Sequence, residues 1–414
     1  MKKYKKKNKC RNCNSSNIKQ ILNLGNLAFT GKFLEKGNLV PKTPLELAMC
    51  SQCKLVQLIH DYDNNYIYGY DYGYQSNINS IMKNHLIKIV NTINRKFKIK
   101  KNDIFIDIGS NDGTLLNHKI LKKCITVGFD PIIKRLKKNY KNINFKIDKF
   151  FNLKNFKKFK IGKAKFITAI AMFYDLNDPN NFLYEIKKIL DEDGVFILEQ
   201  SDLRLMLKQN SFDTICHEHL GYFSIKIIKE MVEKNNLKIF DHEYNESNGG
   251  SSRFYICHKE NYKHKITIKL KKAIDLENKS KIDNIDTLKK FEKKINKLKK
   301  TILHIINIYK KKGPIHGYGA STKGNVLLQY FKLDRKIIKC IADRNPFKWG
   351  KYTPGTNIKI ISEKTSRLQK PKLYIVLPWH FKNEIIKREK IFLKNKGTLF
   401  FPLPKCEIIK MDKK

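Results

Sequence analysis

Arginine and acidic residues are scarce in this sequence of 414 residues, although lysine is abundant. Only nine of the 85 Lys and Arg residues are arginine, and 38 Asp and Glu residues leave a formal net charge of +47. A basic surface attracts phosphate, so this charge first suggests a nucleic-acid partner. Arginine, however, is the residue that forms bidentate contacts with phosphate and guanine, and the lysines are spread along the whole chain. We therefore expect a solvated surface and no specific nucleic-acid partner.

The sequence also lacks a long apolar segment, since no run approaches the ~18 residues of a membrane-spanning helix. The basic residues 2–7 are followed by polar residues and not by the apolar stretch of a signal peptide. The nine cysteines are an odd number, and four of them form two Cys-x-x-Cys pairs. A reducing compartment and a metal site fit this pattern better than a disulfide framework does. The sequence therefore predicts a cytoplasmic protein without membrane association.

Apolar residues make up 41% of the chain and aromatic residues 11%, which is enough for domains with hydrophobic cores. Strand and helix patterns alternate over residues 104–258 and again over 315–399, which favours parallel sheets with helices on both faces. In the first of these stretches we expect helices at 115–122, 131–138 and 181–190. Between the two stretches lies a charged run with apolar residues at helical spacing. We predict an α/β protein divided into segments 1–65, 66–260, 261–312 and 313–414.

The two cysteine pairs, Cys10-x-x-Cys13 and Cys50-x-x-Cys53, lie 36 residues apart in the first segment. Each pair can place two thiolates on one tetrahedral ion, and two such pairs complete a four-cysteine zinc site. A redox role is the alternative, but neither pair begins a helix in a thioredoxin-like unit. Four thiolates saturate zinc, so the sequence predicts a zinc ion that supports structure and takes no part in chemistry.

A hydrophobic strand ends near Asp107 and leads into a glycine-rich turn, Gly109-Ser-Asn-Asp-Gly113. Glycine lets a ligand approach the backbone, although the Gly-x-Gly-x-x-Gly spacing of dinucleotide sites is absent. The acid and the spacing resemble motif I of class I S-adenosylmethionine-dependent methyltransferases. The next strand is followed by Asp130, whose carboxylate can accept hydrogen bonds from both hydroxyls of a ribose. Asp148 follows at a third position, near the expected adenine; a loop that only caps helices is the alternative.

Two histidines, a glutamate and a tyrosine lie close together after a strand at 194–200: His217, Glu218, His219 and Tyr222. Histidine titrates near neutrality, and a neighbouring carboxylate can raise its basicity and orient its ring. We interpret this group as acid/base machinery. A second metal site and a purely structural polar cluster remain alternatives.

The order of these motifs resembles the sugar C-methyltransferase family, whose members methylate a nucleotide-linked deoxysugar on carbon. The resemblance covers nearly the whole chain and also includes residues 72–76, 172–176, 249–251 and 317–325. It implies a zinc-binding N-terminal domain, a Rossmann-like class I methyltransferase sheet and a C-terminal Rossmann-like α/β domain that helps to bind the sugar nucleotide. By resemblance, His219 is the general base and Glu218 assists.

The resemblance also implies which residues bind the ligands. S-adenosylmethionine would contact Tyr74, Ser76, Asp107, Gly109, Ser110, Asn111, Gly113, Asp130, Asp148 and Met172. The substrate would contact Gly250, Ser251, Tyr318, Lys323 and Asn325. A tyrosine of the best-known members aligns with Cys216, so its hydroxyl role would be unfilled here or would pass to Tyr222 or to a tyrosine of residues 72–74.

A second glycine turn, Gly317-x-Gly319, precedes the last group of substrate residues. A dinucleotide site would need an acid about 20 residues further on, and Asp334 and Asp343 are only loosely placed for this. We therefore predict a phosphate-binding loop in which Lys323 and backbone N–H groups meet the diphosphate. A tight turn without a ligand is the alternative.

Together these features predict an S-adenosylmethionine-dependent C-methyltransferase that acts on a nucleotide-diphosphate-linked keto-deoxysugar. Its histidine would remove a proton next to the ketone, and the methyl group would then pass to carbon. A zinc-ribbon nucleic-acid-binding protein and an RNA methyltransferase are the alternatives. The sequence leaves the oligomeric state open, with a monomer included.

Overall fold

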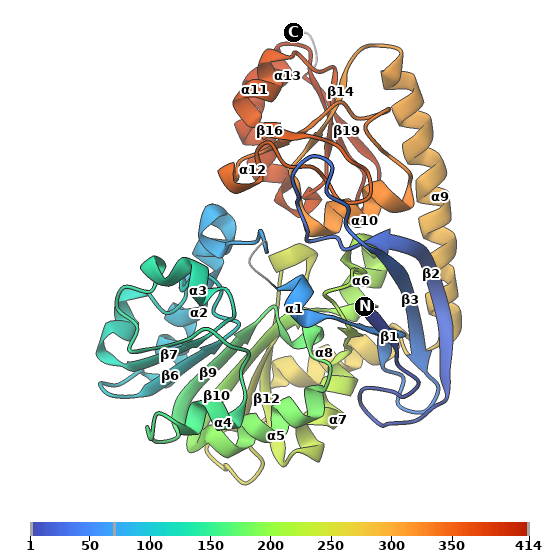
Figure 1. The fold of residues 1–414 in the computed structure, drawn as a ribbon. Coiled ribbons are helices and arrows are strands. Elements are labelled where there is room, and N and C mark those ends of the chain that lie inside the picture. The colour runs from blue at the N-terminus through green and yellow to red at the C-terminus, as the bar shows by residue number, and fades with distance from the viewer. Residues whose placement is uncertain (1–2, 69–71, 412–414) are drawn as a thin grey trace.

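The computed structural model describes residues 3–68 and 72–411, which form three sheet-containing parts joined along one side by a long helix (Figure 1). The N-terminal part has a four-stranded antiparallel sheet in the order β11-β4-β3-β2. Its strands are β2 (Ile18–Ala28), β3 (Lys42–Cys50), β4 (Val56–Leu58) and β11 (Gly221–Tyr222). A small pair, β1 (Tyr4–Lys6) and β5 (His60–Tyr62), lies beside it. Because β11 comes from the middle of the chain, it ties the histidine-rich segment to the N-terminal part.

The central sheet has seven strands in the order β12-β13-β10-β9-β6-β7-β8. They are β6 (Ile104–Ile108), β7 (Ile125–Phe129), β8 (Phe145–Ile147), β9 (Ala164–Ile170), β10 (Leu190–Ser201), β12 (Leu237–Asn245) and β13 (Ser251–His258). All run in the same direction except β13, which is antiparallel to both neighbours. The chain moves outward from β6 to β8 and then returns to the other side of β6 with β9. This change of direction creates a crevice at the carboxyl ends of β6 and β9, where open α/β sheets bind ligands.

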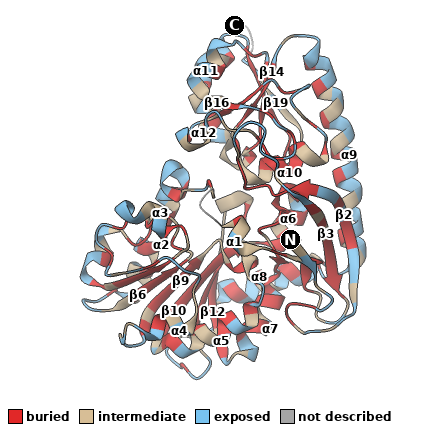
Figure 2. Cartoon of the chain, viewed as in Figure 1, coloured by how far each residue is buried: buried red, intermediate tan, exposed pale blue. Residues whose placement is uncertain are grey.

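Alternate strand residues of the central sheet belong to two hydrophobic cores, one on each face. Figure 2 shows that the strands of this sheet are mostly buried. Phe105, Phe166 and Ile197 pack under α2 (Ser80–Phe97), whose apolar residues recur at helical spacing. Ile106 and Ile167 point to the other face, which is covered by two further helices. These are α5 (Pro179–Ile189) and α7 (Ile225–Lys234). The prediction of a Rossmann-like sheet is confirmed.

The C-terminal part repeats this architecture with six strands in the order β16-β15-β14-β17-β18-β19. The strands are β14 (Ile315–Tyr318), β15 (Ile341–Asp343), β16 (Ile360–Ser362), β17 (Leu373–Val376), β18 (Thr398–Phe401) and β19 (Glu407–Ile409). Its helices are α10 (Thr322–Tyr330), α11 (Glu363–Leu368), α12 (Lys382–Arg388) and α13 (Lys390–Lys394). Only β19 is antiparallel, and β15 and β17 flank the first strand β14. The same change of direction therefore places a second crevice at the end of β14.

The charged run between the two α/β parts forms α8 (Ile268–Lys279) and α9 (Ile285–Lys310). The buried side of α9, from Leu288 to Tyr309, belongs to one core with the N-terminal sheet and the C-terminal part. This shared core joins the N-terminal and C-terminal parts along α9 (Figure 1). Among the described residues, no helix has the length and apolar character needed to cross a membrane.

Two expected helices differ from the structure. Residues 115–122 form turns that end in a short 3-10 helix, Lys119–Lys123, and residues 131–138 hold only α3 (Ile133–Leu136) before another 3-10 turn. The His118 side chain caps the first 3-10 turn by accepting from the N–H of Ile120, which starts the turn well inside the predicted helix. In both segments the helical spacing of apolar residues among lysines predicted a longer helix than the structure has.

Candidate active site

A cavity of about 620 Å³ lies between the carboxyl ends of the central and C-terminal sheets. Gly31, Phe33 and Tyr68 of the N-terminal part also line it, so the chain encloses this space with all three parts. Its size is within the range of about 300 to 1,000 Å³ found for small-molecule sites. The geometry of the fold therefore directs both crevices toward one shared site.

The glycine turn after β6 forms one wall of the cavity. Gly109 has φ +73°, and a Cβ atom there would come within 3.1 Å of the Met172 side chain. The Gly109 N–H donates to the carbonyl of Phe129 at 2.9 Å, and the Asn111 N–H donates to Oδ2 of Asp130 at 2.9 Å. These bonds fix the turn against the end of β7, and Gly109, Ser110, Asn111 and Met172 all line the cavity.

Two aspartates stand at this wall, of which Asp107 is buried and Asp130 is half-buried. Asp107 accepts a hydrogen bond from Oγ1 of Thr168 at 2.6 Å, and burial raises its pKa to about 7. Burial likewise raises the pKa of Asp130 to about 6. Each oxygen of Asp130 accepts one backbone N–H, from Asn111 and Ile132, so further lone pairs remain for the hydroxyls of a ribose.

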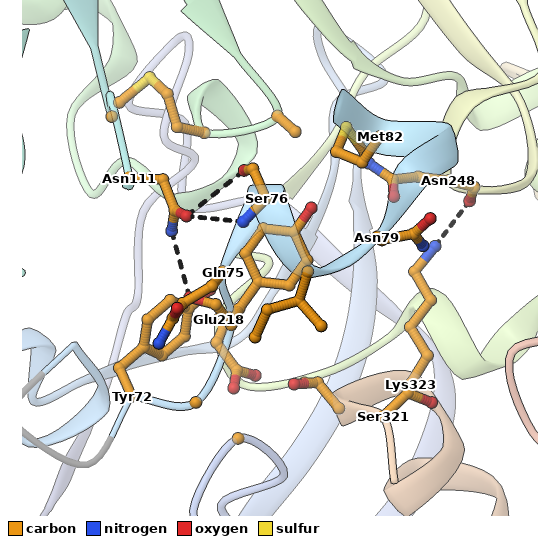
Figure 3. A pocket seen from close by; sticks show the side chains of 18 of the residues that line it. Tyr72, Gln75, Ser76, Asn79, Met82, Asn111, Glu218, Asn248, Ser321 and Lys323 are labelled. Carbon is orange, nitrogen blue, oxygen red and sulfur yellow. Dashed lines mark hydrogen bonds between the residues drawn. The ribbon is translucent and has the colours of Figure 1, made fainter. Parts of the chain in front are cut away.

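The segment of residues 72–76 folds over the glycine turn (Figure 3). Oδ1 of Asn111 accepts from the N–H of Ser76 at 3.0 Å and from its Oγ at 3.3 Å, while Nδ2 of Asn111 donates to the carbonyl of Tyr74 at 3.4 Å. Tyr74 and Ser76 thereby line the cavity. A glycine cradle, a diol-accepting carboxylate and acidic side chains fit the nucleoside and the positively charged sulfonium of S-adenosylmethionine.

Two residues expected at the cofactor lie elsewhere. Gly113 is in the turn beyond the cavity, next to Asn117 and Tyr140. Asp148 is exposed after β8 and is not part of the lining, where Phe150 and Phe151 are found instead. The chain after β8 thus presents aromatic rings to the cavity while the carboxylate faces solvent.

We expect the Gly109→Ala substitution to weaken S-adenosylmethionine binding by at least about tenfold. The new methyl group would press on Met172 at the wall of the cavity, and alanine disfavours a positive φ by about 1–2 kcal/mol. Isothermal titration with S-adenosylmethionine measures the loss. Gly25→Ala is the matched control, because Gly25 also has a positive φ but has open space around its Cβ position. Equal affinity losses in both variants would contradict a role for the turn in binding.

The histidine-rich segment divides between the cavity and the protein core. Glu218 and His219 line the cavity, whereas His217 is fully buried against Phe29 and Tyr62, with ring centroids 4.8 and 5.0 Å away. Tyr222 lies in β11, and its hydroxyl is 3.5 Å from the carbonyl of Thr214, outside the lining of the cavity. Neighbouring residues point in opposite directions here, so only part of the sequence cluster reaches the site.

His219 is held as a neutral ring with a defined tautomer. Its Nδ1–H donates to the carbonyl of Thr214 at 2.8 Å, which leaves the lone pair on Nε2. Burial, aided by the positive charge of Lys323, lowers its pKa to about 3. The ring of Tyr174 lies against it, with centroids 4.2 Å apart. The side chain can therefore accept a proton at one nitrogen.

Two carboxyl groups lie beside this histidine, and sequence reasoning placed only one of them, Glu218, in the site. Glu218 accepts from Oγ1 of Thr30 at 3.1 Å, and burial raises its pKa. Asp175 also lines the cavity, and burial raises its pKa well above the ordinary value, with the charge of Glu218 adding to the effect. Asp175 was part of a recognised segment, but no spacing in the sequence distinguished it from a surface acid. Cys216 is buried behind them, and burial raises the pKa of its thiol.

The C-terminal wall carries Tyr318 and Lys323, as well as four residues that sequence reasoning missed: the cationic Arg344, Lys348 and Arg388, and His380, whose pKa burial lowers to about 3. Lys323 donates to the carbonyl of Asn248 at 2.7 Å (Figure 3). Three expected substrate residues are absent from the lining: Gly250, Ser251 and Asn325. Asn325 instead donates to the carbonyl of Thr30 at 2.7 Å and joins α10 to the N-terminal part.

Charge is separated across the cavity. Among the residues that the structure describes, the Asp, Glu, Lys and Arg side chains that the central and N-terminal walls contribute are all acids: Asp107, Asp130, Asp175 and Glu218. All four Lys and Arg residues of the lining belong to the C-terminal wall, where they stand with Asp343, Glu363 and Glu384. One wall therefore suits a cation and the opposite wall suits an anion, so the excess charge of the chain is not simply gathered in the cavity.

The four cysteines of the two pairs come together far from this cavity, with their sulfur atoms within 4.8 Å of one another. Cys10 and Cys53 are 3.5 Å apart, and Cys13 and Cys50 are 3.6 Å apart. Zn–S bonds of about 2.3 Å would place the sulfurs of a tetrahedral site ~3.8 Å apart, so the cluster fits zinc. Both pairs form the same backbone turn. The N–H of Asn14 donates to the carbonyl of Cys10, and the N–H of Lys54 donates to the carbonyl of Cys50. We call residues 10–14 and 50–54 the two zinc knuckles.

Each of the three parts of the chain matches a family model of known proteins. Family models match as "Putative zinc binding domain" over residues 10–68, "Methyltransferase domain" over 78–242 and "C-methyltransferase C-terminal domain" over 246–404. C-methyltransferase NovU of Streptomyces niveus is 26% identical over 410 residues, which is 97% of each chain.

Solved structures match smaller portions. An S-adenosylmethionine-dependent methyltransferase from Clostridium acetobutylicum is 12% identical, with a TM-score of 0.34, over 42% of this chain and 92% of that chain. Magnesium protoporphyrin IX methyltransferase from Synechocystis, with bound SAH, is 11% identical, with a TM-score of 0.34, over 47% of this chain and 92% of that chain. The assignment of the chain to a family rests on the family models and on the relative that matches over the full length. The chain therefore belongs to the S-adenosylmethionine-dependent C-methyltransferases that combine a zinc-binding, a methyltransferase and a C-terminal domain.

Proposed function

We propose that this enzyme methylates a carbon atom of a nucleotide-diphosphate-linked keto-deoxysugar. The separation of charge across the cavity is the observation that carries the proposal. The acidic wall matches a cationic cofactor, and Lys323 and Lys348 of the opposite wall match a diphosphate. Arg344 and Arg388 of that wall are already paired with Glu363 and Glu384. The similarity to a C-methyltransferase over nearly the full chain supports transfer to carbon.

Carbon becomes nucleophilic most readily next to a ketone, because loss of the adjacent proton gives a stabilised enolate. Bound S-adenosylmethionine supplies an electrophilic methyl group, which is the matching partner for such a carbon. His219 is the base in this proposal, since its Nε2 carries a lone pair and its Nδ1–H is held by Thr214. The charge of Lys323 contributes to the low pKa of His219, so a diphosphate bound to this lysine would raise that pKa and strengthen the base.

The enolate oxygen needs hydrogen-bond donors. Tyr72 and Tyr174 line the cavity, and burial raises the pKa of both hydroxyls well above the ordinary value. They therefore remain protonated donors at neutral pH. In this proposal they take the role of the tyrosine that aligns with Cys216 in related enzymes.

A product analysis tests this function. The zinc-loaded enzyme is incubated with methyl-labelled S-adenosylmethionine and a panel of nucleoside-diphosphate-4-keto-6-deoxysugars, and the products are analysed by NMR. We expect a new C–CH₃ group next to the ketone. The same sugars with the ketone reduced to an alcohol are the matched control and should receive no methyl group, because their ring protons are not acidic. Equal methylation of the reduced sugars, or transfer to oxygen or to RNA alone, would contradict the proposal.

A further inference from the structure

A short 3-10 helix, η5 (Phe212–Thr214), lies just before the histidine-rich segment and ends with the residue that orients His219. The carbonyl of Thr214 accepts the Nδ1–H of His219 at 2.8 Å, and this bond decides which ring nitrogen keeps its lone pair. If the carbonyl moved away, the ring would be free to turn or to carry its proton on Nε2. The contacts that fix η5 therefore also fix the tautomer and direction of His219.

The C-terminal part of the chain holds η5 through two neighbouring side chains. The ring of Phe212 is fully buried and packs on those of Tyr330 and Phe331 at the end of α10, with centroids 5.8 and 5.2 Å away. Asp213 is 1% exposed, and its Oδ2 accepts from the Nε1–H of Trp379 at 2.9 Å. One apolar contact and one directed hydrogen bond thus join η5 to the C-terminal part.

The carboxyl group of Asp213 is costly to bury unless it is hydrogen-bonded or lies near an opposite charge. Trp379 supplies the hydrogen bond, and the charge of Lys323 opposes the rise in pKa that burial causes at Asp213. A hydrogen bond fixes both the distance and the angle between two groups, which apolar packing alone does not. The acid therefore gives η5 a more exact position than an apolar side chain would.

Trp379 is itself held in place by the central part. A Cβ atom at Gly249 would come within 2.8 Å of the Trp379 ring, so the indole lies directly on the backbone of this loop. Lys323 donates to the carbonyl of the neighbouring Asn248 at 2.7 Å. Neither Asp213 nor Trp379 lines the cavity, so they act on the reaction only through the groups that they hold.

We propose that Asp213 is a positioning residue for the base: held by Trp379, it fixes the carbonyl of Thr214 and with it the tautomer and direction of the His219 ring. This inference rests on the proposed function, in which His219 removes the proton of the substrate. A shift of about 1 Å at a positioned group can cost about 10²-fold in rate. The part of the chain that supplies the cationic wall thereby also aligns the base.

Deuterium exchange next to the ketone tests this inference, in D₂O with S-adenosylhomocysteine bound and the nucleotide sugar at saturation. Trp379→Phe keeps an aromatic ring but removes the donor, so we expect exchange to slow about 10- to 100-fold. Asp213→Leu removes the acceptor and should slow exchange about as much. In Asp213→Asn the amide oxygen still accepts from the indole, and the rate should stay within about threefold of the wild type. The affinity for S-adenosylhomocysteine should stay the same in all three variants.

Trp349→Phe is the matched control for the loss of an indole donor. Trp349 is the other tryptophan of the chain, and its Nε1–H donates to the carbonyl of Asp343 at 2.7 Å. Its side chain is exposed and lies outside the lining of the cavity. This variant should therefore exchange the substrate proton at the wild-type rate.

Nitrogen NMR of protein with isotope-labelled histidine reads the tautomer of His219, whose signals are assigned by their absence in His219→Asn. We expect a proton on Nδ1 in the wild type and in Asp213→Asn, and a mixture of tautomers in Trp379→Phe. A lower Tm in Trp379→Phe with the exchange rate and tautomer of the wild type, equal slowing in Trp349→Phe, or a proton on Nε2 in the wild type would overturn the inference but not the proposed function. No exchange by the wild type would overturn both.

Discussion

Replacing His219 by asparagine should lower kcat for methyl transfer by about 10²- to 10⁴-fold, the usual contribution of a general base. Asparagine can still donate to the carbonyl of Thr214, but it has no lone-pair nitrogen for the substrate proton. The affinity for S-adenosylmethionine should change little, because the glycine turn and Asp130 lie on another wall. The loss should therefore appear in kcat and not in cofactor binding.

Proton exchange separates the base from the methyl-transfer step. With S-adenosylhomocysteine bound, the wild-type enzyme in D₂O should exchange the proton next to the ketone of the sugar, and His219→Asn should do so about 10²- to 10⁴-fold more slowly. His304→Asn is the matched control, since His304 is exposed on α9 and does not line the cavity. Methylation by His219→Asn at the wild-type rate would overturn this role.

The pH profile gives a second check on His219. Because burial and Lys323 lower its pKa to about 3, the ring stays neutral in the free enzyme between about pH 5 and pH 8. The kcat/KM value reports on the free enzyme, so it should show no decline through protonation of this ring in that range. An acidic limb centred near about 6.5, the ordinary histidine value, that disappears only in the variant would contradict this environment.

Local patterns predicted the parts of the site that lie within single strand–turn units. The hydrophobic residues before Asp107 and the glycine spacing after it were enough to indicate a glycine turn, whose residues Gly109, Ser110 and Asn111 line the cavity. The two Cys-x-x-Cys pairs were enough to predict the cluster of four thiols. In both cases the backbone geometry of a few consecutive residues determines where the side chains and N–H groups of the motif lie.

Sequence reasoning failed where the direction of a side chain depends on distant segments. His217 and Tyr222 belong to the same short cluster as His219, but pairing of β11 with β4 turns them into the N-terminal core. Asp343 looked loosely placed, because its distance along the chain from Gly319 differs from that of the common fingerprint; the order of β14 and β15 in the sheet brings the two together. Such placements follow from strand pairing and not from spacing.

Removal of the zinc should lower kcat although the metal lies away from the cavity. The first zinc knuckle contains Arg11, whose guanidinium donates to the carbonyls of Leu58 at 2.6 Å and His60 at 3.0 Å. The second knuckle leads from β3 directly into β4, which ends at Leu58. The knuckles therefore fix the position of β4.

The strand β4 in turn holds the segment that carries the base. The N–H of Leu58 donates to the carbonyl of Leu220 at 2.9 Å, and the N–H of Leu220 donates to the carbonyl of Tyr174 at 2.7 Å. Leu220 directly follows His219, so the histidine is fixed between β4 and the turn that contains Tyr174. A shift of about 1 Å at a positioned group can cost about 10²-fold in rate, which makes this connection functionally important.

We expect Cys50→Ser to lose the zinc, to lower the Tm on the order of 10 °C and to lower kcat by about 10²-fold, with a smaller effect on S-adenosylmethionine affinity. Metal analysis, thermal unfolding and single-turnover methyl transfer measure the three effects. Cys406→Ser is the matched control, because Cys406 is a partly buried thiol outside the cluster and should retain both metal and rate. A zinc-free Cys50→Ser enzyme with the wild-type kcat would show that β4 holds His219 in place without the metal. The role of the zinc would then be confined to the stability of the N-terminal sheet.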